Sequence, residues 1–190
     1  GVVEGAPPDA PPCAPQQGVA LQILGSGGPV PDDARASAGY LVWVDGEARV
    51  LVDAGGGTFD RFGQSGAELG TLDAIAISHF HTDHSAELPT FVKGMFFMPR
   101  REAPIVLSGP AGEGVFPGVM EFAEGMFGER GLYRYLGWSL KPGQDSADLQ
   151  LEEVPLDTEV HRVLDADGVE VDAIAVKHGP VPALAYKVEA

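Results

Sequence analysis

The sequence predicts a layered α/β sandwich, on three observations made along the chain. Short strands open it, strands and helices alternate through its middle, and strands return in its last third. The 190 residues are 44% hydrophobic, enough for the core of one domain, and 26 Gly and 16 Pro provide many turns. A Rossmann domain is disfavoured, because the Gly-rich segment at 25–28 is followed by Pro29 and Pro31 and not by a helix.

The expected elements follow from the apolar pattern. The first three strands form an antiparallel meander whose second turn is Asp45-Gly46, a strong hairpin signal. Helical spacing of apolar residues predicts an amphipathic helix with Pro89 in its first turn. In order, we expect strands at 19–24, 39–44 and 48–53, a helix within 58–69, a strand at 72–78, a helix at 88–96, a strand at 105–108, a helix at 119–127, and strands at 151–156, 159–164, 169–176 and 183–188.

The first 18 residues are expected to form a disordered Pro-rich spacer before a domain at 19–190. Because the chain starts with Gly1 and not Met, we interpret this segment as what remains after removal of an export signal. That interpretation predicts a periplasmic or secreted protein, and a disordered tail on a cytoplasmic protein is the alternative. Cys13 is the single cysteine, so no disulfide can form within the chain.

The charge is strongly acidic, with 28 Asp and Glu against 12 Lys and Arg and a net charge of -16. Because nucleic-acid affinity comes largely from cationic contacts with phosphate, this balance predicts that the protein does not bind nucleic acid. We expect the acidity chiefly to keep the protein soluble. We also expect a small-molecule substrate held by local groups or metals. No stretch reaches the roughly 18 apolar residues of a membrane span.

A histidine cluster carries the clearest chemical signal. Three of the five histidines fall within six residues, in the segment His79-x-His81-x-Asp83-His84. In extended backbone, His79 and His81 place both imidazoles on one side, where they can bind one metal ion. Asp83 and His84 follow as the chain turns toward a helix and can face a second ion. These donors suit Zn²⁺, and Mn²⁺ or Fe²⁺ would also fit them. We expect Glu87 to be an exposed helix residue, and bracing of the ligand loop from the helix is the alternative.

This segment, placed after a buried strand, resembles the signature of the metallo-β-lactamase superfamily. Asp53 resembles the structural aspartate that supports the metal loop in that family without binding metal. The segment 176–188, which carries His178 and Tyr186, resembles the ribonuclease Z-like, phosphodiesterase-like branch. The resemblance implies a metallo-β-lactamase αβ/βα sandwich in which His178 joins His79 and His81 around the first of two zinc ions.

The resemblance also implies a mechanism. A metal-bound hydroxide would attack a small ester or a phosphodiester, with Asp83 acting both as metal ligand and as the catalytic carboxylate that orients the water. The expected function is therefore that of a zinc-dependent hydrolase. The alternative is a metal-binding but non-catalytic fragment, or a partner subunit that lacks some of the ligands. A β-lactamase proper is disfavoured, because the segment 176–188 resembles the other branch.

The sequence departs from the family after His178. The family has a later bridging aspartate and a last histidine, but only Glu189 is acidic in the remaining segment, which contains no histidine. We therefore expect the first part of a longer protein, with the second half of the sandwich incomplete, or a chain completed by a homodimer partner or a C-terminal segment. Left alone, the strand at 72–77 and the helix at 88–96 are expected to expose a large apolar surface.

Overall fold

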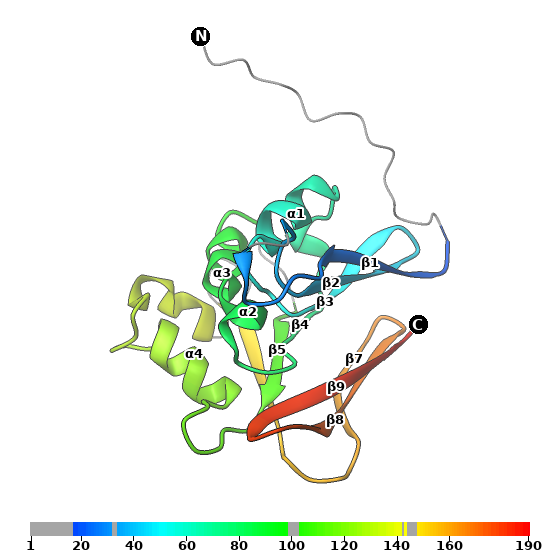
Figure 1. Ribbon diagram of the computed structural model, residues 1–190. Coiled ribbons are helices and arrows are strands. Elements are labelled where there is room, and N and C mark those ends of the chain that lie inside the picture. Colours follow the sequence, from blue (N-terminus) through cyan, green and yellow to red (C-terminus); the bar gives the residue numbers. More distant parts are fainter. Residues whose placement is uncertain (1–16, 32–33, 99–102, 142, 144–147) are drawn as a thin grey trace.

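The computed structural model describes residues 17–31, 34–98, 103–141, 143 and 148–190. A layer of helices, a six-stranded sheet and a three-stranded sheet stack in that order (Figure 1). The predicted α/β sandwich is confirmed. The Pro-rich segment at 1–16, with Cys13, lies outside the described residues, so the spacer stays a prediction.

The larger sheet has the strand order β1-β2-β3-β4-β5-β6. Its first three strands form the predicted meander, and Asp45 and Gly46 both have the positive φ that a type I′ turn requires. The next strands run parallel to β3, so the chain leaves β3, β4 and β5 at the same edge of the sheet. The strands are β1 (Val19–Gly25), β2 (Gly39–Val44), β3 (Glu47–Val52), β4 (Ala74–Ala76), β5 (Ile105–Pro110) and β6 (Leu149–Val154).

The smaller sheet is an antiparallel meander of the last three strands, β7 (His161–Ala166), β8 (Val169–His178) and β9 (Val181–Glu189). His178 pairs with Val181 across the second turn, which leaves a two-residue loop of Gly179 and Pro180. Gly179 has φ +60°, as the first position of a type II′ turn requires. The end of β8 therefore projects His178 at the tip of a tight hairpin.

The helices follow the predicted pattern, with three short additions. The first helix lies within the predicted 58–69 and ends at Gln64, before Gly66, which has a positive φ. The additions are a single turn directly after His81 and 3₁₀ helices at 69–71 and 134–140, which apolar periodicity did not mark. The helices are α1 (Thr58–Gln64), η2 (Leu69–Thr71), α2 (Thr82–Ser85), α3 (Leu88–Met95), α4 (Val119–Phe127) and η3 (Arg134–Leu140).

The core has two parts, one on each face of the larger sheet. Ile75 and Leu107 pack toward the helices, whereas Val50 and Val106 pack against the smaller sheet. The expected exposure of the strand at 72–77 is wrong, and for the helix at 88–96 it holds only at Phe96, which is 51% exposed. The reason is that the chain's own last strands cover one face of the sheet while helices cover the other. None of the described helices is long and apolar enough to cross a membrane.

Candidate metal centre

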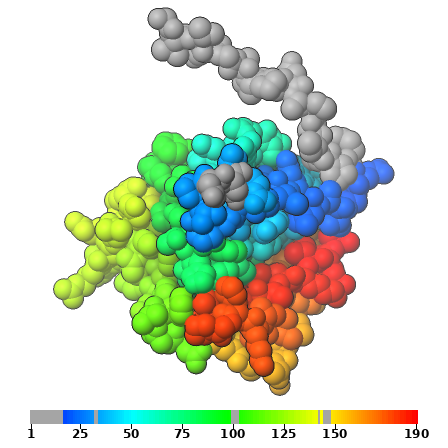
Figure 2. All heavy atoms as spheres, in the orientation of Figure 1, coloured from blue at the N-terminus to red at the C-terminus, as the bar shows by residue number. Residues whose placement is uncertain are grey.

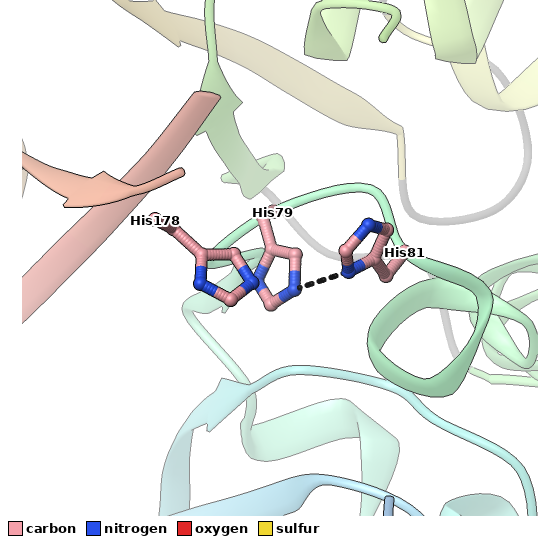
Figure 3. A group of neighbouring side chains, drawn as sticks. All are labelled: His79, His81 and His178. Carbon is pink, nitrogen blue, oxygen red and sulfur yellow. Dashed lines mark hydrogen bonds between the residues drawn. The ribbon is translucent and has the colours of Figure 1, made fainter. Parts of the chain in front are cut away.

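Three histidines converge where the carboxyl end of β4 meets the β8–β9 turn. The green loop after β4 and the orange turn lie together at the surface (Figure 2). One nitrogen from each of His79, His81 and His178 lies within 4.8 Å of the others (Figure 3). His79 is buried, whereas His178 is exposed, so the cluster opens to solvent on one side.

The spacing of these nitrogens fits a shared metal ion. Zinc–nitrogen bonds of about 2.0–2.1 Å in a tetrahedral site place two ligand nitrogens roughly 3.3 Å apart. Nε2 of His79 and Nδ1 of His81 are 3.2 Å apart. Three imidazoles would leave a fourth position free, as catalytic sites require. The donor set therefore suits zinc or another borderline metal ion.

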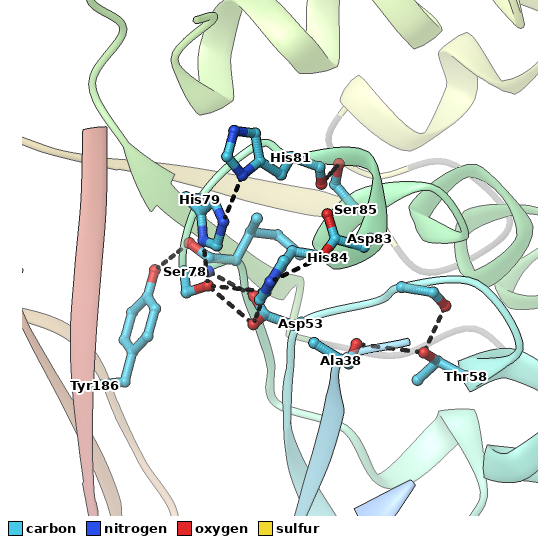
Figure 4. Close-up of polar contacts among 12 residues, drawn as sticks. Ala38, Asp53, Thr58, Ser78, His79, His81, Asp83, His84, Ser85 and Tyr186 are labelled. Carbon is cyan, nitrogen blue, oxygen red and sulfur yellow. Dashed lines mark hydrogen bonds and ion pairs between the residues drawn. The ribbon is translucent and has the colours of Figure 1, made fainter. Parts of the chain in front are cut away.

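The buried Asp53 determines, directly or through Ser78, which ring nitrogen of His84 and of His79 carries the proton (Figure 4). Asp53, 2% exposed and with φ +61°, accepts hydrogen bonds from the Ser78 amide at 2.7 Å and its hydroxyl at 2.9 Å. The same carboxylate lies 2.7 Å from Nδ1 of His84. Ser78 Oγ is also 3.0 Å from Nδ1 of His79. This is the structural support expected of Asp53.

These contacts fix the tautomers of two histidines. Because the Ser78 hydroxyl donates to Asp53, it must accept from Nδ1–H of His79. Asp53 likewise accepts from Nδ1–H of His84. In the neutral rings, both Nε2 atoms then carry the lone pair with which imidazole binds metal, and that of His79 faces Nδ1 of His81 at 3.2 Å.

The second predicted position has two donors. Nε2 of His84 and Oδ2 of Asp83 are 3.5 Å apart, and the rings of His84 and His79 have centroids 4.0 Å apart. The structure thus brings together all five predicted site residues, His79, His81, Asp83, His84 and His178. Their binding of metal stays a prediction.

The electrostatics of the two supported histidines differ. Burial, together with the neighbouring His84, lowers the pKa of His79 to about 4, so its ring is neutral at neutral pH. Burial also acts to lower the pKa of His84, but the hydrogen bond and charge of Asp53, with the charge of Asp83, outweigh it and raise that pKa. A metal ion must therefore displace a more firmly held proton from His84.

The loop that carries Asp83 and His84 is held by the loop after β3 and by Ala38, which directly precedes β2. The amide of Ala54 donates to the carbonyl of His84 at 2.8 Å, and that of Ala38 donates to the carbonyl of Asp83 at 3.2 Å. Gly55 passes so close that a Cβ there would lie 2.1 Å from the Asp83 carbonyl oxygen. The glycine is needed for this approach, because any side chain would push the two loops apart.

Glu87 corrects a prediction. We expected an exposed helix residue, but its carboxylate accepts hydrogen bonds from the amides of Gly57 at 2.7 Å and Phe59 at 2.6 Å. These amides belong to the first turn of α1, whose free N–H groups favour a negative charge. Glu87 therefore ties α1 to the helical segment that follows the histidine loop.

The hairpin that carries His178 is fastened to the same loop by β9. The Leu184 amide donates to the Ser78 carbonyl at 2.9 Å, and the Tyr186 hydroxyl donates to the Ile77 carbonyl at 3.1 Å. Burial raises the pKa of Tyr186, which keeps its hydroxyl protonated as a donor. Sequence reasoning missed Ser78, although its position between the buried strand and His79 was a usable signal.

Comparison with known proteins agrees with this geometry. Residues 32–184 match the metallo-beta-lactamase superfamily. The chain belongs to that superfamily. It is 32% identical over 182 residues to ribonuclease Z of Mycobacterium marinum, covering 90% of this chain and 59% of that protein. It is 30% identical over 166 residues to ribonuclease Z of Methanosarcina acetivorans, covering 87% and 47%. The chain thus spans about half the length of these relatives.

Solved structures show the same fold. The short form of human tRNase Z superposes with a TM-score of 0.65 at 20% identity, covering 88% of this chain and 64% of that one. A diphosphatase of the PhnP family gives a TM-score of 0.56 at 20% identity, covering 90% and 62%. The predicted superfamily and its ribonuclease Z-like character are confirmed.

The exclusion of nucleic acid is wrong. The relatives are ribonucleases by name, and the fold is shared with tRNase Z. The acidity of this chain therefore does not exclude RNA as a ligand. The error has a physical reason. Net charge averages over the whole surface, whereas contacts with phosphate are local and metal ions at a site add positive charge that the sequence does not count.

Proposed function

We propose that this chain carries the metal centre of a metal-dependent hydrolase that cleaves phosphodiester bonds, with RNA as the substrate class. The observation that carries the proposal is the convergence of the nitrogens of His79, His81 and His178 within 4.8 Å. The similarity to ribonuclease Z favours a phosphodiester over a small ester as the bond that is cleaved.

The proposed ligands divide between two ions. His79, His81 and His178 would hold the first, and Asp83 with His84 would contribute to the second. Zinc suits the mixture of imidazole and carboxylate, and manganese or iron would fit the same donors. When bound, such ions would supply Lewis acidity toward a phosphoryl oxygen and lower the pKa of a water molecule.

The chain's own residues have three further tasks in this proposal. Asp53 and Ser78 hold the protons of His84 and His79 on Nδ1, away from the substrate side. Asp83 places a carboxylate beside Nε2 of His84, where it would accept a hydrogen bond from the attacking water and orient it. The exposed His178 leaves the substrate an open approach.

The test combines metal analysis with hydrolysis. The 190-residue chain would be purified with zinc or manganese, its metal content measured, and its activity assayed on bis(p-nitrophenyl) phosphate, p-nitrophenyl acetate and an end-labelled RNA. We expect bound metal and cleavage of the phosphodiesters. His79→Ala should lose both, whereas His161→Ala, a control outside the cluster that contacts Asp157, should lose neither.

Two outcomes would count against the proposal in different ways. Metal bound at the cluster without hydrolysis of any substrate would favour a non-catalytic metal-binding protein. Metal content that His79→Ala does not reduce would place the metal elsewhere and overturn the assignment of the ligands.

A further inference from the structure

A group of aromatic side chains lies at the end of α3 and in and just before η3, two parts of the helical layer. Its members are Phe96, Phe97, Tyr133, Tyr135 and Trp138, here called the aromatic patch. Phe97 is 76% exposed, Tyr135 62% and Phe96 51%. Trp138 is partly buried against the core, whereas the other rings are exposed and gain little from it, which indicates that they bind something outside the chain.

The patch joins two segments of the chain into one surface. The ring centroids of Phe96 and Trp138 are 5.8 Å apart, and those of Tyr133 and Tyr135 are 6.3 Å apart. Lys93 lies between the segments, with Nζ 4.7 Å from the Phe96 ring, 4.9 Å from that of Phe97 and 5.9 Å from that of Tyr135. An ammonium group is thus held among exposed ring faces.

Four cations lie on the segments that carry the patch, and the described residues offer them no carboxylate partner. Arg49, Arg162 and Lys187 are paired with Asp73, Asp172 and Glu189. In the part of the chain that the structure describes, no carboxylate lies within ion-pair distance of Lys93, Arg130, Arg134 or Lys141. Three of these four lie in the segment 129–141, whose one carboxylate is Glu129. In a chain of net charge -16, the segments that carry the exposed rings therefore also carry four cations without a carboxylate partner among the described residues, of which Lys93 contacts the rings directly.

An apolar groove continues the patch on one side. It runs between α1, η2 and the end of α3, has a volume of about 410 Å³, and is lined by Phe59, Phe62, Leu69, Phe97 and Met98 among others. Phe97 therefore belongs to both the patch and the groove. A flat ring that stacks on Phe97 could extend into this groove, where Glu68 is the one charged residue among the described residues that line it.

We propose that the aromatic patch and this groove bind single-stranded RNA. Bases would stack on the rings, since every base has a π face, while Lys93, Arg130, Arg134 and Lys141 would meet the phosphates. Charge complementarity selects an anionic polymer, and the adjacent rings select one with stackable bases. The choice of RNA rests on the proposed function, but binding here needs no metal.

The patch would act at a distance from the cleavage site. The chain leaves β4 at the histidine loop and runs back through α3 to the start of β5. Phe96 and Phe97 at the end of α3 therefore lie toward the opposite end of the parallel strands. RNA held there would be anchored remotely, and its binding would be separable from hydrolysis.

The test measures binding without catalysis. The 190-residue chain in EDTA would be titrated into a fluorescein-labelled oligouridylate of twelve nucleotides and followed by fluorescence anisotropy. The double variant Phe97→Leu/Tyr135→Leu keeps apolar side chains but removes the π faces, and should weaken binding at least about tenfold. Tyr135→Phe and Leu21→Ala, an exposed apolar control on β1, should stay within about twofold of wild type. Circular dichroism would check that each variant is folded.

The salt dependence tests the cations separately. For single strands, each phosphate contact contributes about 0.7 to the slope of log K against log salt. Arg130→Gln/Arg134→Gln should therefore reduce that slope by about 1.4, whereas Lys187→Gln, outside the patch, should leave it unchanged.

Each contrary result overturns the proposal. If the chain does not bind the oligouridylate, or if the leucine variant binds it as tightly as wild type, then bases do not stack on Phe97 and Tyr135. If anionic phosphatidylserine vesicles bind in place of RNA, the leucine variant still binds them and Phe97→Asp/Tyr135→Asp does not, the patch is a lipid-binding surface. If sedimentation shows self-association that Phe97→Asp abolishes, it is an interface between copies. Neither result bears on the metal centre, whose metal content and hydrolysis are measured with the His79 variant.

Discussion

Two pairs of histidines in the metal centre are held in different ways. His79 and His84 have their Nδ1 atoms engaged by Ser78 and Asp53. For Nε2 of His81 and for His178, the described residues provide no hydrogen-bond partner. The first pair is therefore oriented by hydrogen bonds before any metal binds. Among the described residues, the second pair has only ring contacts with Phe116 and His79 and the approach of His81 Nδ1 to His79, and it would take its final orientation from the ion.

The largest effect is expected where one residue supports both members of the first pair. Asp53→Ala should weaken zinc affinity about 100-fold, since loss of such a supporting partner typically costs 10–100-fold and here two ligands lose it. The free energy of unfolding in EDTA should also fall by about 1–3 kcal/mol, because the Ser78 amide loses its acceptor. Competition with a zinc-binding dye and urea unfolding would measure the two effects. Unchanged affinity would show that the ligands need no preorganisation.

The comparison also explains which parts of the site the sequence could predict. His79, His81, Asp83 and His84 lie within six residues, so local spacing indicated a shared chemistry. His178 is nearly a hundred residues away, and only resemblance to a family pointed to it. Nothing local can predict that a hairpin will be fastened to Ser78 through Leu184, because that contact depends on how two sheets pack.

The fold shows the same division. Apolar periodicity predicted every strand and gave α4 its observed bounds, since period and burial are directly linked. It could not predict that helices would cover Ile75 and Ile77 while the last strands covered Ala74 on the other face, and so the expected exposure of this strand was wrong. The prediction from net charge that RNA is not bound was wrong for a similar reason, because net charge contains no information on where charged side chains lie in the fold.

A smaller effect is expected from the hydroxyl that supports His79 alone. Ser78→Ala removes the acceptor for Nδ1 of His79 but leaves the Asp53–His84 contact intact, so zinc affinity should fall about tenfold. Nitrogen-15 NMR of the metal-free protein should show the Nδ1-protonated form of His79 in wild type and a mixture of tautomers in the variant. A single, unchanged tautomer would mean that Ser78 does not orient the ring.

The attachment of the second pair can be loosened through Tyr186. Tyr186→Phe removes the hydrogen bond to the Ile77 carbonyl and the contact with Ser108, which should reduce the free energy of unfolding by about 1–2 kcal/mol. Zinc affinity should fall less than about tenfold, because Leu184 still joins β9 to Ser78. Urea unfolding and dye competition would separate the two quantities. A loss of affinity as large as that of Asp53→Ala would contradict the distinction between the pairs.

The smallest effect on the metal is expected at the turn that carries His178. Gly179 has φ +60° and Gly66 has φ +77°, and a Cβ at either would meet nothing within 4 Å. Alanine at each position should therefore reduce stability by a similar amount, about 1 kcal/mol, through backbone strain alone. Only Gly179→Ala should also weaken zinc binding, by about two- to fivefold, because relief of that strain tilts the hairpin tip while a bound ion can still draw His178 back. Isothermal calorimetry on both variants would measure the difference. Equal zinc affinity in the two variants would mean that His178 is held as rigidly as His79. The two pairs of histidines would then differ in their hydrogen bonds, but that difference would not affect zinc affinity.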